Sequence, residues 1–277
     1  MHQLTESVFY QNGYPTSGCA VTPEGVLAVD GPCFPSSALE WRDFIADKGP
    51  LRYLVNSEHH FDHIVANRFL GGAVVASEYT NAHFLDSAGS SEGAADLVRR
   101  LSPGDASLVE GYTLRPPETV YRGRLTLRLG GQTFRLIHSP GHTRGQTIVH
   151  AVEARVAFTG DNLTPGMHPF FHSSSLWEWF ESLALLESLD VDWFVPGHGD
   201  PCGKEEIPLA RARLQERIEE VRRLKAQGRS REEVQEEARY IDRPGLDWPR
   251  EVGPRAYDLE KAGLGAIFDQ LEDHPAG

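Results

Sequence analysis

Glu58-His59-His60-Phe61-Asp62-His63 is the stretch that decides how this sequence is interpreted, because it places several potential metal ligands within six residues. It follows residues 51–55, whose pattern is typical of a strand, so the cluster is predicted to lie in a loop directly after that strand. Imidazole and carboxylate together suit zinc and other first-row metals. Taken alone, the stretch leaves open a histidine-rich surface loop that binds nothing.

Three further ligand-capable residues lie in glycine-containing turns that follow predicted strands. They are His142 within residues 139–143, Asp161 within residues 159–162 and His198 within residues 196–199. A backbone without a Cβ can approach a metal closely, which explains glycine beside each of them. Because loops at strand ends gather on one edge of an α/β fold, we expect all four segments to converge on one site.

The hydrophobic pattern predicts short strands in both halves of the chain, followed in each half by helices. The strands are expected at residues 7–10, 18–21, 26–29, 51–55, 73–76, 124–129, 133–138, 147–151, 156–159 and 191–195. This order indicates a layered α/β fold with two sheets inside and helices outside. We expect residues 1–204 to form one domain and residues 205–277 a helical C-terminal extension packed on it.

Helix starts are marked by serine. Residues 36–37 are expected to cap a helix over residues 38–46, and residues 78–101 are expected to be helical with an interruption at residues 87–93. Ser175 with Glu178, and Ser230 with Glu233, have the spacing of capping boxes.

Composition limits the function further. The formal charge of −13 repels nucleic-acid phosphates, and three cysteines without a CxxC pair give no disulfide framework. Residues 1–6 lack the features of a signal peptide, and no apolar run approaches the roughly 20 residues of a membrane span. We therefore expect a cytoplasmic protein that acts on a small molecule, without nucleic-acid or membrane partners. A homodimer through the helical tail is left open.

The four segments resemble the metallo-β-lactamase superfamily, whose signature is HxHxDH followed by single histidine, aspartate and histidine motifs. The resemblance covers roughly residues 7 to 200. It implies an αββα sandwich with two divalent metal ions at one edge, zinc first, with iron or manganese as alternatives. By that pattern the residue at 58, His60 and His142 hold one ion. Asp62, His63 and His198 hold the second, and Asp161 bridges the two.

Position 58 departs from the family pattern, because Glu58 stands where the first histidine of HxHxDH belongs. One interpretation is that only the second ion binds. We favour the other, in which Glu58 is itself a ligand, since a carboxylate binds zinc at a distance similar to that of imidazole nitrogen. The added negative charge also makes iron or manganese more favourable.

The resemblance implies an enzyme that uses a metal-bound hydroxide, oriented by Asp62, to hydrolyse an ester, thioester, lactone or amide. His168 and His172 follow Asp161 and are predicted to contact the substrate. Two alternatives stay open: a non-haem iron oxidoreductase of the same fold, with sulfur or oxygen chemistry, and a metal-binding module without turnover.

Overall fold

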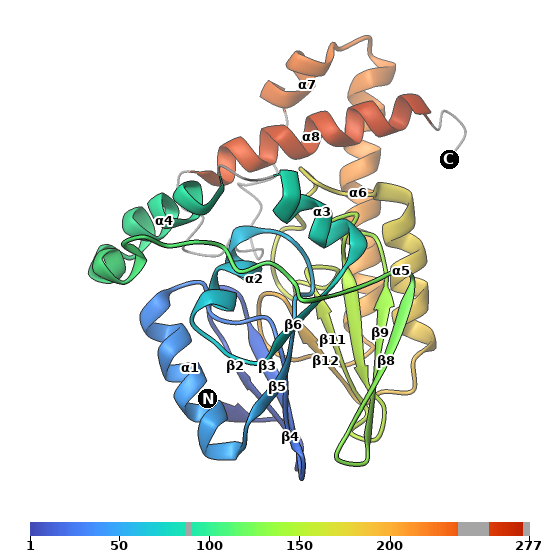
Figure 1. Ribbon diagram of the computed structural model, residues 1–277. Coiled ribbons are helices and arrows are strands. Elements are labelled where there is room, and N and C mark those ends of the chain that lie inside the picture. Colours follow the sequence, from blue (N-terminus) through green and yellow to red (C-terminus); the bar gives the residue numbers. More distant parts are fainter. Residues whose placement is uncertain (87–89, 238–254, 274–277) are drawn as a thin grey trace.

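Two β-sheets pack face to face in the computed structural model, with helices on both outer faces (Figure 1). The structure describes residues 1–86, 90–237 and 255–273. The first sheet has seven strands in the order β1-β2-β3-β4-β5-β6-β7, and the second has five in the order β12-β11-β10-β9-β8. The predicted αββα sandwich is confirmed.

The strands have the following bounds. The first sheet contains β1 (His2–Gln3), β2 (Val8–Gln11), β3 (Ser17–Thr22), β4 (Gly25–Val29), β5 (Leu51–Val55), β6 (Ala73–Ser77) and β7 (Thr119–Tyr121). The second contains β8 (Arg124–Leu129), β9 (Gln132–His138), β10 (Thr147–Ala151), β11 (Val156–Gly160) and β12 (Trp193–Pro196). All predicted strands are present. The short strands β1 and β7 were not predicted, because two or three residues carry no detectable period.

The helices cover the two outer faces and the edge that carries the ligand candidates. They are α1 (Pro35–Lys48), α2 (Phe61–Ile64), α3 (Glu78–Asp86), α4 (Ser90–Leu101), α5 (Leu176–Ser188), α6 (Glu206–Ala226), α7 (Arg231–Glu237) and α8 (Arg255–Asp273). Two 3₁₀ segments, Val65–Arg68 and Pro103–Val109, complete the described elements. None of these helices is both long and apolar enough to span a bilayer.

Alternation along the strands divides the core into layers. In β4, Leu27 and Val29 belong to the cluster between the sheets, whereas Val26 and Ala28 pack outward with Trp41 of α1. Such a period of two follows from side chains that alternate across a strand. Both faces of β4 are therefore buried, which holds its carboxyl end firmly in place.

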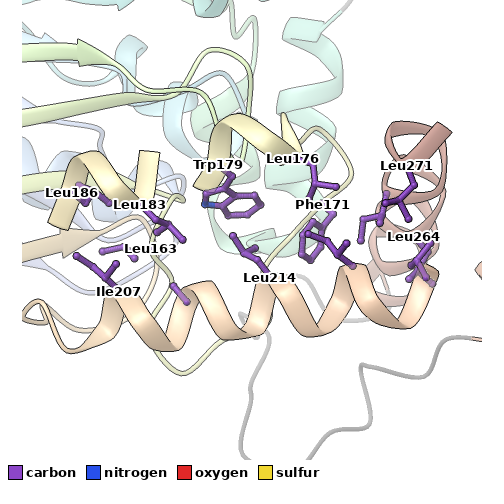
Figure 2. Packing of buried hydrophobic residues seen from close by; sticks show 14 of the residues in the cluster. Leu163, Phe171, Leu176, Trp179, Leu183, Leu186, Ile207, Leu214, Leu264 and Leu271 are labelled. Carbon is purple, nitrogen blue, oxygen red and sulfur yellow. The ribbon is translucent and has the colours of Figure 1, made fainter. Parts of the chain in front are cut away.

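The C-terminal helices share a hydrophobic cluster with the outer face of the second sheet. Phe194 of β12, Trp179 of α5, Leu214 of α6 and Leu264 of α8 all belong to it. Figure 2 shows side chains of α5, α6 and α8 meeting in this cluster. The helical extension thus packs on the same core as the strands, although its division from residues 1–204 stays a prediction.

Two predicted helix starts need correction. Helix α1 begins at Pro35, directly before the two serines, and Phe34 is its N-cap. Proline fits the first helical position, where no backbone N–H is needed. Ser175 is the N-cap of α5 but makes no side-chain capping bond, so that capping box is wrong. The other is confirmed: the N–H of Ser230 donates to Glu233 at 2.8 Å and the N–H of Glu233 to Ser230 Oγ at 3.2 Å.

The predicted interruption between residues 78 and 101 is confirmed in part. Helices α3 and α4 are separate, and α4 begins at Ser90. Residues 87–89, within the predicted break, lie outside the described part of the chain.

Candidate metal centre

Strand ends bring the ligand candidates together. Residues 58–63 follow β5, Asp161 follows β11 directly, and His198 follows β12. His142 lies between β9 and β10, which are antiparallel, so it occupies the same edge as the end of β11. Segments more than a hundred residues apart in sequence therefore meet at one edge of the sandwich, as predicted.

Glu58 is the centre of a first group of ligand candidates. Its Oε1 lies 2.9 Å from His60 Nδ1, 3.5 Å from His142 Nε2 and 3.6 Å from His63 Nε2. Its Oε2 accepts the backbone N–H groups of His59 and His60, both at 3.1 Å. The carboxylate is completely buried, and the two backbone donors fix Oε1 towards the imidazoles.

Asp62 and His198 form a second group with His63. The Oδ2 atom of Asp62 lies 3.3 Å from His198 Nε2 and 3.6 Å from His63 Nε2. Asp161 contacts both groups: its Oδ1 lies 3.3 Å from His63 Nε2, and its Oδ2 lies 3.4 Å from His198 Nε2 and 3.6 Å from His142 Nε2. Asp161 thus lies between the two groups, and its role as a bridging ligand stays a prediction.

The imidazoles are oriented by partners behind them. His63 Nδ1 lies 2.9 Å from Asp30 Oδ2, and His142 Nδ1 lies 2.9 Å from the carbonyl oxygen of Phe170. When the imidazole is neutral, each acceptor fixes its proton on Nδ1, so that an unprotonated Nε2 faces the centre. Asp30 directly follows β4 and was not among the predicted site residues, because no local motif marks its contact with His63.

Electrostatic attraction shifts the pKa values of Glu58 and His63 more than burial does. Burial alone would raise the pKa of Glu58, but the imidazoles of His60 and His63 hold that pKa well below its usual value. Burial alone would lower the pKa of His63, but Asp62 and Asp161 raise it well above the usual value. The carboxylates are therefore ionised and attract protons onto His60, His63 and His198, and these are protons that a cation would displace.

Unsatisfied buried atoms show that these residues fit a metal ion. His63 Nε2 and Asp161 Oδ1 are buried and make no hydrogen bond with any residue in the described ranges. Buried polar atoms without a partner are rare and costly. Glu58 with His60 and His142, Asp62 with His63 and His198, and Glu58 with His63 and Asp161 each bring ligand atoms within 4.8 Å of one another. Imidazole and carboxylate are the donors that zinc accepts.

Gly197 makes the close approach of Asp161 feasible. A Cβ at this position would collide with Asp161 Oδ1 and with the backbone at Gly160. Any larger residue would displace the carboxylate that stands between the two groups.

A cavity of about 80 Å³ opens beside these residues. His60, Asp62, His142, Asp161 and His198 line it.

Two histidines were also predicted to contact substrate, and the structure places them differently. His172 lines the cavity, with its Nε2 3.1 Å from His60 Nε2, whereas His168 is completely buried and is not among the described lining residues. Tyr14, over His198 with ring centroids 5.3 Å apart, also lines the cavity and was not predicted.

Comparisons with known proteins agree with this geometry. The sequence profile of the metallo-beta-lactamase superfamily matches residues 20–198. Hydroxyacylglutathione hydrolase of Cereibacter sphaeroides is 28% identical over 165 residues, covering 59% of this chain and 52% of that protein. Atrochrysone carboxyl ACP thioesterase of Aspergillus fumigatus is 25% identical over 205 residues, covering 69% and 46%. The chain thus spans about half the length of these curated relatives.

A solved structure resembles this fold over most of its length. A metallo-beta-lactamase family protein from Thermus thermophilus superposes with a TM-score of 0.69 over 99% of this chain and 96% of its own, at 17% identity. At that identity the likeness concerns the fold alone.

Proposed function

Because this chain belongs to the metallo-beta-lactamase superfamily, we propose that it is a hydrolase with two divalent cations, zinc first, which cleaves an ester, thioester, lactone or amide. The convergence of carboxylates and imidazoles in three overlapping groups around Asp161 is the observation that carries the proposal. In the proposed assignment, Glu58, His60 and His142 hold one cation, Asp62, His63 and His198 hold the other, and Asp161 contacts both.

The names of the relatives support hydrolysis of an acyl compound. One is named a hydroxyacylglutathione hydrolase and the other a carboxyl ACP thioesterase. Hydrolysis of such a compound adds the OH of water to the acyl carbon and gives a proton to the leaving oxygen, sulfur or nitrogen. A bound pair of divalent cations would supply hydroxide at neutral pH, by lowering the pKa of water towards about 7.

The chain's own residues would position and deprotonate the water. Asp62 lines the cavity and keeps an ionised carboxylate, because the neighbouring His63 and His198 outweigh burial and lower its pKa. It would orient the attacking water and accept its proton. His172, on the cavity side of His60, would contact the acyl oxygen or the leaving group.

Removal and return of metal tests the proposal. The protein is stripped with EDTA, then loaded separately with zinc, manganese or iron(II), and assayed on uncharged thioesters, aryl esters and lactones. We expect no hydrolysis by the stripped protein and recovery with at least one metal. Hydrolysis that survives complete stripping, or no hydrolysis with any of the metals, would overturn the proposal. Iron in the purified protein together with oxygen consumption would instead favour the oxidoreductase alternative.

Substitution of Glu58 tests the first cation separately. Glu58→Ala should lose about one of two bound ions per chain, counted by elemental mass spectrometry, because it removes the oxygen that three imidazoles face. In Glu58→Gln the backbone N–H groups of His59 and His60 must face the amide oxygen, so the NH₂ group takes the place of Oε1 and this variant should lose the ion as well. Glu178→Ala, on α5 outside the described ligand groups, is the control. An unchanged metal content in Glu58→Ala would refute the role of Glu58.

A further inference from the structure

The cavity has an apolar wall beside the ligand candidates. It consists of side chains from five separate segments, namely Tyr14, Phe61, Leu97, Phe170 and Leu259. Phe170 packs with Ala256 of α8, and Tyr14 and Leu259 lie against this pair. A bound molecule would thus meet aromatic and aliphatic side chains next to the carboxylates and imidazoles.

Cationic side chains are missing from this lining. Among the residues described around the cavity there is no lysine or arginine. Away from the proposed cations, a negatively charged group on the substrate would therefore meet neither lysine nor arginine among these described residues, and would lose hydration on entering an apolar wall. The formal charge of −13 acts in the same direction at longer range.

Helix α8 is fixed firmly enough to define the size of the cavity. Leu264 and Leu271 are buried in the cluster with α5 and α6 (Figure 2). Glu260, next to Leu259, forms a buried ion pair with Arg217 of α6. These contacts hold the first half of α8 across the cavity edge, where Figure 1 shows it passing close to α4, which carries Leu97.

We propose that the apolar wall binds the acyl chain of an uncharged ester or thioester, and that Leu259 is a specificity-determining residue which limits the length of that chain. The proposal rests on the proposed hydrolase function and names its substrate class. A cavity of about 80 Å³ holds several heavy atoms, since one water needs roughly 10–15 Å³ of such space. A short acyl group of about four carbons fits, and a long one meets Leu259.

Chain-length profiles test the role of Leu259. The metal-loaded protein is assayed with 4-nitrophenyl acetate, butyrate and octanoate. Leu259→Ala should raise kcat/KM for the octanoate relative to the butyrate by at least about fourfold, the contribution of one buried methylene. Leu259→Trp should shift the preference towards the acetate by a similar factor. Leu209→Ala removes an exposed leucine of α6 and should leave the profile unchanged.

A pair of esters of similar shape tests the charge. The 4-methylpentanoate and the hemisuccinate differ mainly in replacing an isopropyl group with a carboxylate. After subtraction of the uncatalysed rate, kcat/KM for the hemisuccinate should be at least about tenfold lower, because the carboxylate gains no partner for its lost hydration. Equal rates on the two esters would overturn the proposed preference for an uncharged substrate.

Binding without turnover separates this inference from the proposed function. Calorimetry measures the affinity of alkyl trifluoromethyl ketones of increasing length for the metal-loaded protein and for the Leu259 variants. If no ester is hydrolysed but Leu259→Ala extends the length that binds best, the hydrolase function fails and the apolar wall stands. If esters are hydrolysed but neither variant changes the length profile in either assay, the role of Leu259 is wrong. Thermal unfolding of each variant confirms that it is folded.

Discussion

Replacing Asp30 with asparagine should weaken zinc binding by about 10- to 100-fold while the fold is retained, as is typical when a partner of a metal-binding histidine is changed. The backbone N–H and the hydroxyl of Ser57 donate to the two oxygens of Asp30, at 2.8 and 2.6 Å. The second of these oxygens, Oδ2, also lies 2.9 Å from His63 Nδ1. The side chain is buried with its backbone at φ 54°, a conformation in which asparagine is also tolerated.

The geometry dictates which way the asparagine must turn. The N–H of Ser57 can only donate, so the amide oxygen must take the place of Oδ1 and the NH₂ group the place of Oδ2. That NH₂ group then faces His63 Nδ1, which becomes an acceptor. The neutral imidazole must carry its proton on Nε2, the atom that faces Asp161 and the proposed cation.

Alanine at the same position should act differently. It leaves both donors of Ser57 and the Nδ1 of His63 buried without an acceptor, at about 1–3 kcal/mol for each group. It also places a residue less suited than aspartate at positive φ, which adds about 1 kcal/mol. We expect a loss of at least about 4 kcal/mol in the free energy of unfolding for Asp30→Ala, and a much smaller loss for Asp30→Asn.

Two measurements separate metal affinity from stability. Zinc affinity is obtained by competition with a chromogenic chelator, and the free energy of unfolding from urea denaturation of the stripped protein. Asp105→Asn is the matched control, since this buried aspartate accepts from Ser36 and Ser102 at 3.1 and 3.0 Å and is not among the ligand candidates. Zinc affinity of Asp30→Asn within about twofold of that of the unsubstituted protein would refute the tautomer argument.

Three further predictions follow from burial and charge. Burial raises the pKa of the Cys19 and Cys202 thiols to about 12, so neither should react with a disulfide reagent near pH 8 in the folded protein, whereas both react in guanidinium; labelling of either without denaturant would contradict this. Burial alone would lower the pKa values of His63 and His198, but the neighbouring carboxylates have the larger effect. They raise the pKa of His198 to about 10 and the pKa of His63 well above its usual value. Zinc needs both imidazoles neutral, so zinc binding near pH 7 should release about two protons, and zinc affinity should rise with pH from about 6 to about 9. Calorimetry in two buffers measures the proton release. Zinc binding without any proton release would contradict these pKa shifts. Leu214→Ala removes a buried side chain between α5 and α6 and should lower the free energy of unfolding by about 2–5 kcal/mol in urea; a loss below about 1 kcal/mol would show that the site collapses.

The convergence of the ligand candidates was predictable because each follows a strand. Once β5, β11 and β12 are recognised from their apolar patterns, their carboxyl ends must lie at one edge, and glycine beside His142 and His198 marks the close approaches. Strand positions and layer order are likewise expressed in local periodicity.

Contacts between distant segments were not predictable in this way. Asp30 and His63 are 33 residues apart, and nothing near Asp30 distinguishes a carboxylate that orients an imidazole from one that ends a strand. The position of Leu259 at the cavity was not predictable either, because it also depends on contacts between segments far apart in the sequence. A helical period shows that a helix has a buried face but not what lies against it. His168 and His172 lie close together in the sequence, in one loop. Only the path of that loop places His172 at the cavity and buries His168.

The charge of Glu58 and the lining of the apolar wall both bear on which substrate charge the cavity would accept. Glu58, Asp62 and Asp161 are acidic and buried, so together they bring three negative charges to the centre. Two divalent cations, as proposed, would bring four positive charges, which would leave one, and a hydroxide would leave none. A histidine at position 58 would instead leave the centre with a positive charge, able to attract an anionic substrate over a distance of about a Debye length. With glutamate there, neither the centre nor the described wall favours an anion. Glutamate at position 58 and the absence of lysine and arginine among the described lining residues would therefore favour the same class of substrate, the uncharged one proposed above.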